Sequence, residues 1–228
     1  TPKPSSAASD VYKRQSKESG IKTFRDQDGL WNNHRVEDVA TPEAFYRNPT
    51  LVYEFYNNRR KELNSGIKPN KAHFTLKNLE KYLKINIITQ NIDNLHEISG
   101  SSDIIYMHGE LNKARCIKND SHIYPWVNDL TEKDACIQCG SQMRPHIVWF
   151  GEMPFQMEKI HSIAEESSLF VSIGTSGEVY PAAGFVNMFK EMKKPTVELN
   201  LEPSLNQDQF DFAIHKPATI AVSYTHLT

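Results

Sequence analysis

Polar side chains follow four short apolar segments of this chain, and their types suit the binding of a nucleotide. The stretch TQNIDNLHEISG (89–100) follows residues 85–88, three of which are isoleucine. The other three polar stretches are His108-Gly109-Glu110, Gly174-Thr175-Ser176 and Asn200-Leu201-Glu202. Amide side chains and backbone N–H groups bind ribose and phosphate, and glycine allows close approach of the backbone. One such turn is weak evidence, but four of them, with a histidine among their residues, predict a nucleotide site.

These turns require a parallel sheet to bring them together. The apolar segments 85–89, 104–108, 168–174 and 196–201 predict strands, and helical patterns at 48–63, 70–83, 158–167 and 181–192 lie between them. Asn48 and Pro49 are a typical helix start, and Phe74, Leu76, Leu79 and Leu83 have helical spacing. Alternating strands and helices predict an α/β fold with a parallel sheet covered on both faces. Ligands of such a sheet lie at the carboxyl ends of its strands.

Composition narrows the class of protein. A chain of 228 residues is long enough for one core, or for one domain with a smaller lobe. The net charge of −2 argues against a nucleic-acid or anionic-lipid partner. The apolar segments are too short for a membrane span, and we find no signal peptide. The odd number of cysteines, 3, favours a reducing compartment over a disulfide framework, so we expect a cytoplasmic protein. We also expect a monomer.

The cysteines predict a structural zinc site in residues 112–147. Cys136 and Cys139 form a Cys-x-x-Cys pair, and Cys116 precedes them. A second such pair would need a cysteine at position 119, where the chain has asparagine. The fourth ligand is therefore open between His122 and Asp120. We expect this segment to be a loop module held by metal, and to form a small lobe together with a helical insertion.

Several motifs taken in order resemble the sirtuin family of NAD-dependent protein-lysine deacylases. They are TQNIDNLHEISG, MHGEL, RPHIVWFGEMP, IGTSGEVYPAAGF and ELNLEP, and the likeness runs from about Ser16 to Ala218. The pattern is most similar to bacterial members that remove succinyl groups. The resemblance implies a Rossmann-like, doubly wound parallel sheet with a smaller zinc-ribbon and helical lobe. The implied NAD-binding domain comprises 16–31, 84–111 and 148–220, and the implied lobe comprises 32–83 and 112–147.

The resemblance also implies the reaction and the residues that perform it. NAD would be consumed to remove succinyl, malonyl or acetyl groups from lysines of proteins or peptides, releasing nicotinamide and O-acyl-ADP-ribose. His108 would be the general base, a role that suits a side chain whose pKa lies near neutral pH. The residues expected to bind NAD are Ser19, Gly20, Phe24, Arg25, Gln90, Asn91, Ile92, Asp93, Gly174, Thr175, Ser176, Asn200, Leu201, Glu202 and Ala218.

Substrate binding is assigned by the same resemblance to two segments. Val148, Phe150, Gly151 and Glu152 would line the acyl-lysine tunnel and pair with the substrate peptide as an added strand. Tyr56 and Arg59 share one face of a helix, and a hydroxyl beside a guanidinium suits the carboxylate of a succinyl or malonyl group. Arg47 and Arg60 are nearby alternatives for this arginine.

The chain departs from the family at its start. Sirtuins begin with an apolar strand and a Gly-Ala-Gly turn, but Tyr12, Lys13 and Arg14 stand where the turn is expected. Side chains there obstruct the backbone's approach to a diphosphate. We therefore expect residues 1–15 and 221–228 to be frayed tails or foreign sequence, with weak or no NAD turnover by this chain and lower stability.

Three alternative functions have to be compared with deacylation. The same NAD site would serve mono-ADP-ribosyl transfer, in which a label on NAD stays on the target protein. A catalytically impaired module that binds acyl-lysine peptides is supported by the missing glycine turn. A zinc-ribbon nucleic-acid binder is disfavoured, because acidic residues balance the basic ones around the cysteines.

Overall fold

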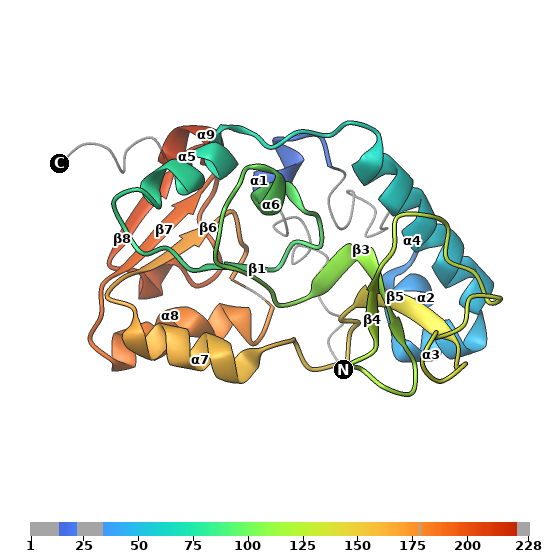
Figure 1. The fold of residues 1–228 in the computed structure, drawn as a ribbon. Coiled ribbons are helices and arrows are strands. Elements are labelled where there is room, and N and C mark those ends of the chain that lie inside the picture. The colour runs from blue at the N-terminus through green and yellow to red at the C-terminus, as the bar shows by residue number, and fades with distance from the viewer. Residues whose placement is uncertain (1–13, 22–33, 178, 223–228) are drawn as a thin grey trace.

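The fold is described from a computed structural model, which describes residues 14–21, 34–177 and 179–222. Two regions lie side by side (Figure 1). The parallel region contains residues 14–21, 71–106, 157–177 and 179–222. The small lobe contains residues 34–64 and 109–147. Within the described residues, no helix combines the length and the apolar composition needed to cross a membrane.

The parallel region contains the four strands expected from the sequence. β1 (Ile87–Thr89) pairs with β2 (Ile104–Tyr106), and β6 (Phe170–Ile173) pairs with β7 (Thr196–Asn200), each in parallel. A further strand, β8 (Phe212–His215), extends the sheet beyond β7 and was not expected. Among the described strands, β1 pairs only with β2, and β6 only with β7. The described strands of the expected doubly wound sheet therefore form two separate pieces, β1-β2 and β6-β7-β8.

β6 is less buried than a strand inside a parallel sheet normally is. The exposed fraction of Val171, in β6, is 37%, although strands inside a parallel sheet are normally buried on both faces.

Helices cover both faces of the parallel strands. The short helices α1 (Arg14–Lys17), α6 (Leu95–Ile98) and α9 (Ala218–Ala221) lie with α5 (Lys71–Leu79) on one side, and α7 (Met157–Glu166) and α8 (Phe185–Glu191) lie on the other (Figure 1). The 3₁₀ turn η1 (Ala182–Gly184) leads into α8, and η2 (Gln207–Gln209) precedes β8. Two separate small cores lie beneath these layers, one containing Leu199 and one containing Met107.

The expectation for the helix at 70–83 was wrong in two respects. α5 ends at Leu79, and the side chains of Phe74 and Leu83 are 47% and 59% exposed. The buried face instead carries Ala72, His73, Thr75 and Leu79. Ala72 belongs to the core that contains α9, where a small side chain allows the two helices to approach. α5 thus packs in the parallel region, although it lies inside the insertion expected at 32–83.

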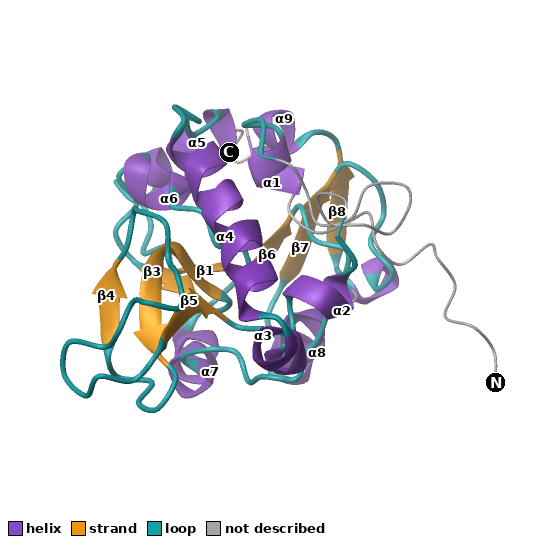
Figure 2. Cartoon of the chain, turned by 90° about the vertical axis from the view of Figure 1, so that its right-hand side faces the viewer, coloured by secondary structure: helices purple, strands orange, loops and turns teal. Residues whose placement is uncertain are grey.

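The small lobe combines a helical hairpin with an antiparallel sheet. α2 (Val36–Val39), α3 (Pro42–Arg47) and α4 (Pro49–Asn64) pack against β3 (Gly109–Cys116), β4 (Ile123–Pro125) and β5 (Met143–Ile147) (Figure 2). The sheet order is β4-β3-β5. Asn48 caps α4 as expected, because its side chain accepts a hydrogen bond from Leu51 N at 3.2 Å. The expected loop module is therefore partly a sheet.

A single core fills the small lobe. It contains buried residues of all three helices together with Leu111, Ala114, Met143 and Ile147 of the sheet. Arg60 is also fully buried, and it donates hydrogen bonds to the carbonyl oxygens of Leu111 and Asn128. These bonds attach α4 to the sheet and to the loop that follows β4.

Candidate functional site

His108 lies at the junction of the two regions. It follows β2 and is followed by Gly109, the first residue of β3. Gly109 has φ 87°, and a Cβ there would overlap the carbonyl oxygen of His146. Only glycine fits at this close crossing of β3 and β5, and this crossing fixes the backbone beside the histidine.

One hydrogen bond determines the tautomer of His108. Its Nδ1 lies 3.2 Å from the carbonyl oxygen of Gln90. A carbonyl oxygen only accepts, so Nδ1 carries the hydrogen and Nε2 is the acceptor nitrogen of the neutral ring. This is the arrangement that a general base requires.

A cleft brings most of the expected catalytic and substrate residues together. The expected residues that line it are His108, Gln90, Ile92, Tyr56, Val148, Phe150, Gly151 and Glu152. Ile147, Trp149, Pro154, Val179 and Tyr180 complete its wall. The cleft therefore joins two strand ends of the parallel region to the segment that leaves β5.

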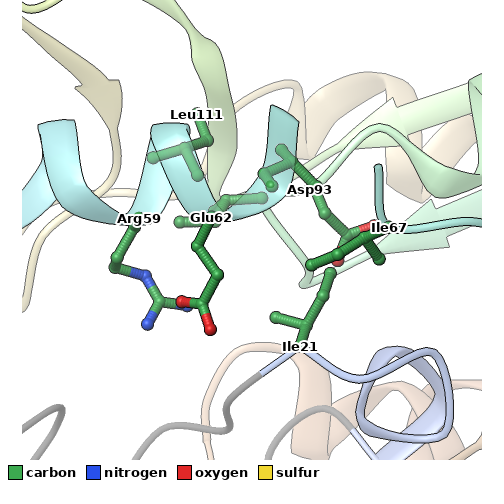
Figure 3. Close-up of a pocket in the computed structure, with 8 residues that line it drawn as sticks. Ile21, Arg59, Glu62, Ile67, Asp93 and Leu111 are labelled. Atoms are coloured by element: carbon green, nitrogen blue, oxygen red, sulfur yellow. The ribbon is translucent and has the colours of Figure 1, made fainter. Parts of the chain in front are cut away.

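A second and much smaller cavity adjoins the cleft, because Ile92 lines both. Arg59 and Glu62 extend from the same side of α4 (Figure 3). Ile21, Ile67 and Asp93 also line this cavity. Tyr56 and Arg59 thus share a helix face as expected, but each lines a different cavity.

The structure distinguishes the three candidate arginines. Arg60 is held by backbone carbonyls inside the small lobe, and Arg47 pairs with Asp38 at 2.8 Å on the surface. Arg59 is 4% exposed and is the one of the three that lines a cavity next to the cleft. Of these three arginines, only Arg59 lies beside the cleft, and its role toward an acyl group stays a prediction.

A buried network that the sequence did not reveal supports the wall of the cleft. Trp149 Nε1 donates to the Tyr56 hydroxyl at 3.0 Å, and the Arg144 guanidinium lies 3.4 Å from the centroid of the Trp149 ring. Glu152 accepts hydrogen bonds from Arg144, Arg115 and Trp149 N. Burial alone would raise the pKa of Glu152, but the bonds and charges of these partners lower it. Burial raises the pKa of Tyr56 well above its usual value, so its hydroxyl stays protonated.

The expected residues near Ser16 form contacts with one another. Asn91 Nδ2 donates to Ser16 Oγ at 2.7 Å, and Asn70 Nδ2 donates to Ser19 Oγ at 2.9 Å. Gly20 follows with φ 93°. Phe24 and Arg25, and Tyr12 and Lys13 at the departure from the family, lie outside the described residues.

The expected residues after β6 and β7 lie at one edge of the sheet. Asn200 Nδ2 donates to the carbonyl oxygen of Thr175 at 2.6 Å, and this bond ties the two strand ends together. Gly174 has φ 63°, Ser176 is buried, and Leu201 and Glu202 are exposed. The N–H of Ala218 donates to Glu18 at 2.7 Å, which attaches α9 to the segment after α1. Their roles toward NAD stay a prediction.

A group of possible metal ligands lies in the small lobe. Cys116, His122, Cys136 and Cys139 bring one ligand atom each to within 4.8 Å of one another. Burial opposes ionisation of Cys136, but hydrogen bonds from Tyr124, from backbone N–H groups and from His122 lower its pKa to about 6. A thiolate is the form that binds metal, and three sulfurs with one imidazole fit tetrahedral zinc. Of the two expected fourth ligands, His122 is in the group, whereas Asp120 lies 3.6 Å from Arg115.

Comparison with known proteins agrees with this arrangement. The model of the Sir2 family matches residues 15–181. The chain belongs to the Sir2 family. Sir2 relatives named "NAD-dependent protein deacylase" occur in Pasteurella multocida, 56% identical over 92% of this chain and 91% of the relative, and in Vibrio cholerae, 55% identical over 91% and 86%. "NAD-dependent protein deacylase SIR2rp3" of Leishmania major is 52% identical over 91% and 88%.

Solved Sir2 structures share the fold. A Sir2 homologue in complex with NAD matches with a TM-score of 0.83 and 34% identity, over 92% of this chain and 84% of that one. A complex titled "Sir2-p53 peptide-NAD+" matches with a TM-score of 0.78 and 28% identity, over 93% and 88%. The Rossmann-like α/β architecture with a smaller lobe is thereby confirmed.

Within the described residues, the cleft fits the nicotinamide riboside end of NAD. Gln90 Oε1 is buried and has no hydrogen-bond partner among them, so this acceptor lacks a donor. Gln90 and His108 line the same cleft. An amide or a sugar hydroxyl is the kind of donor that this oxygen requires, and nicotinamide riboside has both.

Proposed function

We propose that this Sir2-family chain is an NAD-dependent protein-lysine deacylase that prefers acyl groups ending in a carboxylate. The observation that supports the reaction is the shared cleft of His108, Gln90 and the segment 147–152. The names of the relatives point to the same activity. The preference is supported by the buried Arg59 in the cavity that adjoins this cleft.

NAD supplies, when bound, an activated bond between ribose and nicotinamide. In the proposal, Gln90 Oε1 orients the nicotinamide riboside end, together with Asn91, Ile92 and Asp93. His108 Nε2 takes a proton from a ribose hydroxyl, because its Nδ1 is held by the Gln90 carbonyl. Val148 and Phe150 contact the aliphatic stem of the lysine, and backbone groups of Gly151 and Glu152 pair with the peptide.

Acyl recognition divides between the two cavities. Tyr56 is held by Trp149 at the wall of the cleft, and Arg59 lies beyond Ile92. A carboxylate that extends past Ile92 meets a guanidinium shielded from water, where a charge-assisted hydrogen bond is strong. An acetyl group is too short to gain this contact.

The remaining parts of the proposal concern the metal, the partners, the cellular location and the oligomeric state. Zinc bound by the four ligands would hold the small lobe together and would not activate water, because the four ligands leave no open position. The partners are acylated proteins or peptides. Three cysteines that carry no disulfide support a reducing, cytoplasmic location. We also propose a monomer without nucleic-acid partners.

The reaction is tested by nicotinamide release from NAD with succinyl-lysine and acetyl-lysine peptides. Two proteins are compared: this chain, and a variant with residues 1–15 replaced by an apolar strand ending in Gly-Ala-Gly-Ile. We expect weak turnover by the first and faster turnover by the second. In the second, His108→Ala should slow turnover by about 10²- to 10⁴-fold through loss of the base. Silence of the second protein with both peptides would contradict the deacylase proposal, and label transferred from NAD to protein would favour ADP-ribosyl transfer.

The acyl preference is tested with Arg59→Met and the matched Arg60→Met in the variant with the replaced start. Arg59→Met should lower the ratio of succinyl to acetyl kcat/KM by about 10- to 100-fold, the usual value of a charge-assisted hydrogen bond. Arg60→Met removes a neighbouring buried arginine that binds backbone, so it should lower stability and leave this ratio unchanged. Equal effects of the two variants on the ratio would contradict the role of Arg59.

A further inference from the structure

A tight turn at residues 119–122 fixes the ring of His122 within the metal-ligand group. His122 N–H donates to the carbonyl oxygen of Asn119 at 3.0 Å, and Cys116 N–H donates to the carbonyl oxygen of His122 at 3.0 Å. The ring Nδ1 then lies 3.3 Å from Cys136 Sγ, and Nε2 lies 3.1 Å from Asn119 Nδ2. Nδ1 is therefore the nitrogen that faces the metal position.

The amide orientation of Asn119 is determined by Ser121. Asn119 Oδ1 accepts from Ser121 N at 3.0 Å and from Ser121 Oγ at 2.7 Å. A backbone N–H only donates, so the oxygen of the amide must face it, and the NH₂ group must face His122 Nε2. Since NH₂ also only donates, Nε2 is an acceptor, and the neutral ring carries its hydrogen on Nδ1.

A metal requires the opposite tautomer of this ring. Ligation through Nδ1 needs a lone pair there, and a neutral ring then carries its hydrogen on Nε2, where a carboxylate or carbonyl normally accepts it. We propose that Asn119, which stands where a second Cys-x-x-Cys pair would place its cysteine, opposes this ligand tautomer and so weakens zinc binding by His122. On loading, the Nδ1 hydrogen leaves to solvent, Nε2 gains one from solvent, and the Asn119 amide has to turn.

Turning the amide does not remove the conflict. With Oδ1 toward His122 Nε2–H, the NH₂ group faces the backbone N–H of Ser121, which then loses its acceptor. One N–H of the turn is left without a partner in either orientation. A carboxylate at this position has an oxygen for each donor, so Asn119→Asp satisfies both at once.

Zinc affinity measured by competition with a chromophoric chelator tests the proposal. Partners in the shell outside the ligands typically change metal affinity by about 10- to 100-fold. We expect Asn119→Asp to raise zinc affinity by about tenfold or more. Gln138→Glu is the matched control, because it adds the same charge on an exposed residue between Cys136 and Cys139. It should change the affinity much less.

The double variant Asn119→Asp with His122→Ala separates action through the ring from direct ligation. The gain should disappear in the His122→Ala background if Asn119 acts through the ring. Cobalt spectra add a second readout, since three sulfurs and one nitrogen give different visible bands from three sulfurs and one oxygen. A gain that survives His122→Ala, or an equal gain in Gln138→Glu, would overturn the proposal.

The tautomer is observed directly by ¹⁵N NMR of the histidine ring. The metal-free chain should show hydrogen on Nδ1 of His122, and the zinc-loaded chain should show it on Nε2. A ring that keeps hydrogen on Nδ1 when zinc is bound, or whose signals do not respond to zinc, would show that His122 is not a ligand. Either result would contradict the proposal without reference to enzyme activity.

Discussion

The small lobe encloses one continuous core between its helices and its sheet, whereas the parallel region has two small cores on opposite faces of a sheet described in two pieces. β5 is buried at every residue, but β6 has one exposed and two half-buried residues out of four. Burial of apolar area is the main favourable term in folding. The comparison predicts that the small lobe is the more stable region and that the expected NAD side is the weaker one.

The largest effect that would test this comparison is removal of one apolar side chain in each region. Leu130→Ala in the small lobe removes a side chain that is 0% exposed and should cost about 2–5 kcal/mol. Val171→Ala in β6 removes one that is 37% exposed, so its cost should be below about 1 kcal/mol. Urea unfolding and amide hydrogen exchange measure both. Similar costs for the two variants would show that the regions are equally well packed.

The next effect concerns acid sensitivity of the parallel region. Burial, followed by the nearby His96, lowers the pKa of His73 from 6.5 to about 3. The folded state therefore keeps His73 neutral while the unfolded state takes up a proton below pH 6.5. Stability should fall as pH falls from about 6.5 toward 3, by up to about 1.4 kcal/mol per pH unit.

His73→Asn should reduce this slope, because Asn retains an acceptor for Asn70 N–H but does not titrate. Unfolding free energies at pH 7 and pH 5 provide the measurement. The matched variant in the small lobe is His146→Asn, where burial and nearby Arg115 lower the pKa to about 4. An unchanged slope in His73→Asn would place the acid sensitivity elsewhere.

The smallest effect comes from two helix caps. Thr41 Oγ1 accepts from Ala44 N at 3.0 Å in the small lobe, and Thr41→Ala should cost about 1 kcal/mol. Asn70 accepts from Ala72 N in the parallel region and also donates to Gln15 O and Ser19 Oγ. Asn70→Ala should cost more than Thr41→Ala, since it also detaches α1, and thermal unfolding compares the two. A larger cost for Thr41→Ala would argue against the importance of these contacts.

Local patterns in the sequence were sufficient for the parts of the site that are local. Gln90 and His108 directly follow apolar strands, and Tyr56 and Arg59 are separated by one helical turn. Each could be placed because its neighbours in sequence are its neighbours in space. The choice between Arg59 and Arg60 depended on what Arg60 binds across the lobe. The spacing of residues in the sequence contains no information on that contact.

The parts that were missed depend on long-range pairing. Trp149 reaches Tyr56 across 93 positions of the chain. The polar composition of residues 112–147 predicts a loop module, whereas most of β3 and all of β5 lie in this segment. Arg115 and Arg144 are buried because Glu152, from outside both strands, balances their charge. No hydrophobic periodicity signals such a strand.

Gly109 has a mechanical consequence for the two regions. The chain passes from β2 to β3 through His108 and Gly109, and β3 then runs through the whole small lobe to the ligand group at Cys116. The same eight-residue strand therefore joins the backbone beside His108 to the metal-ligand group. A bulkier residue at position 109 would push β3 away from β5, and the strand would carry that displacement to both of its ends.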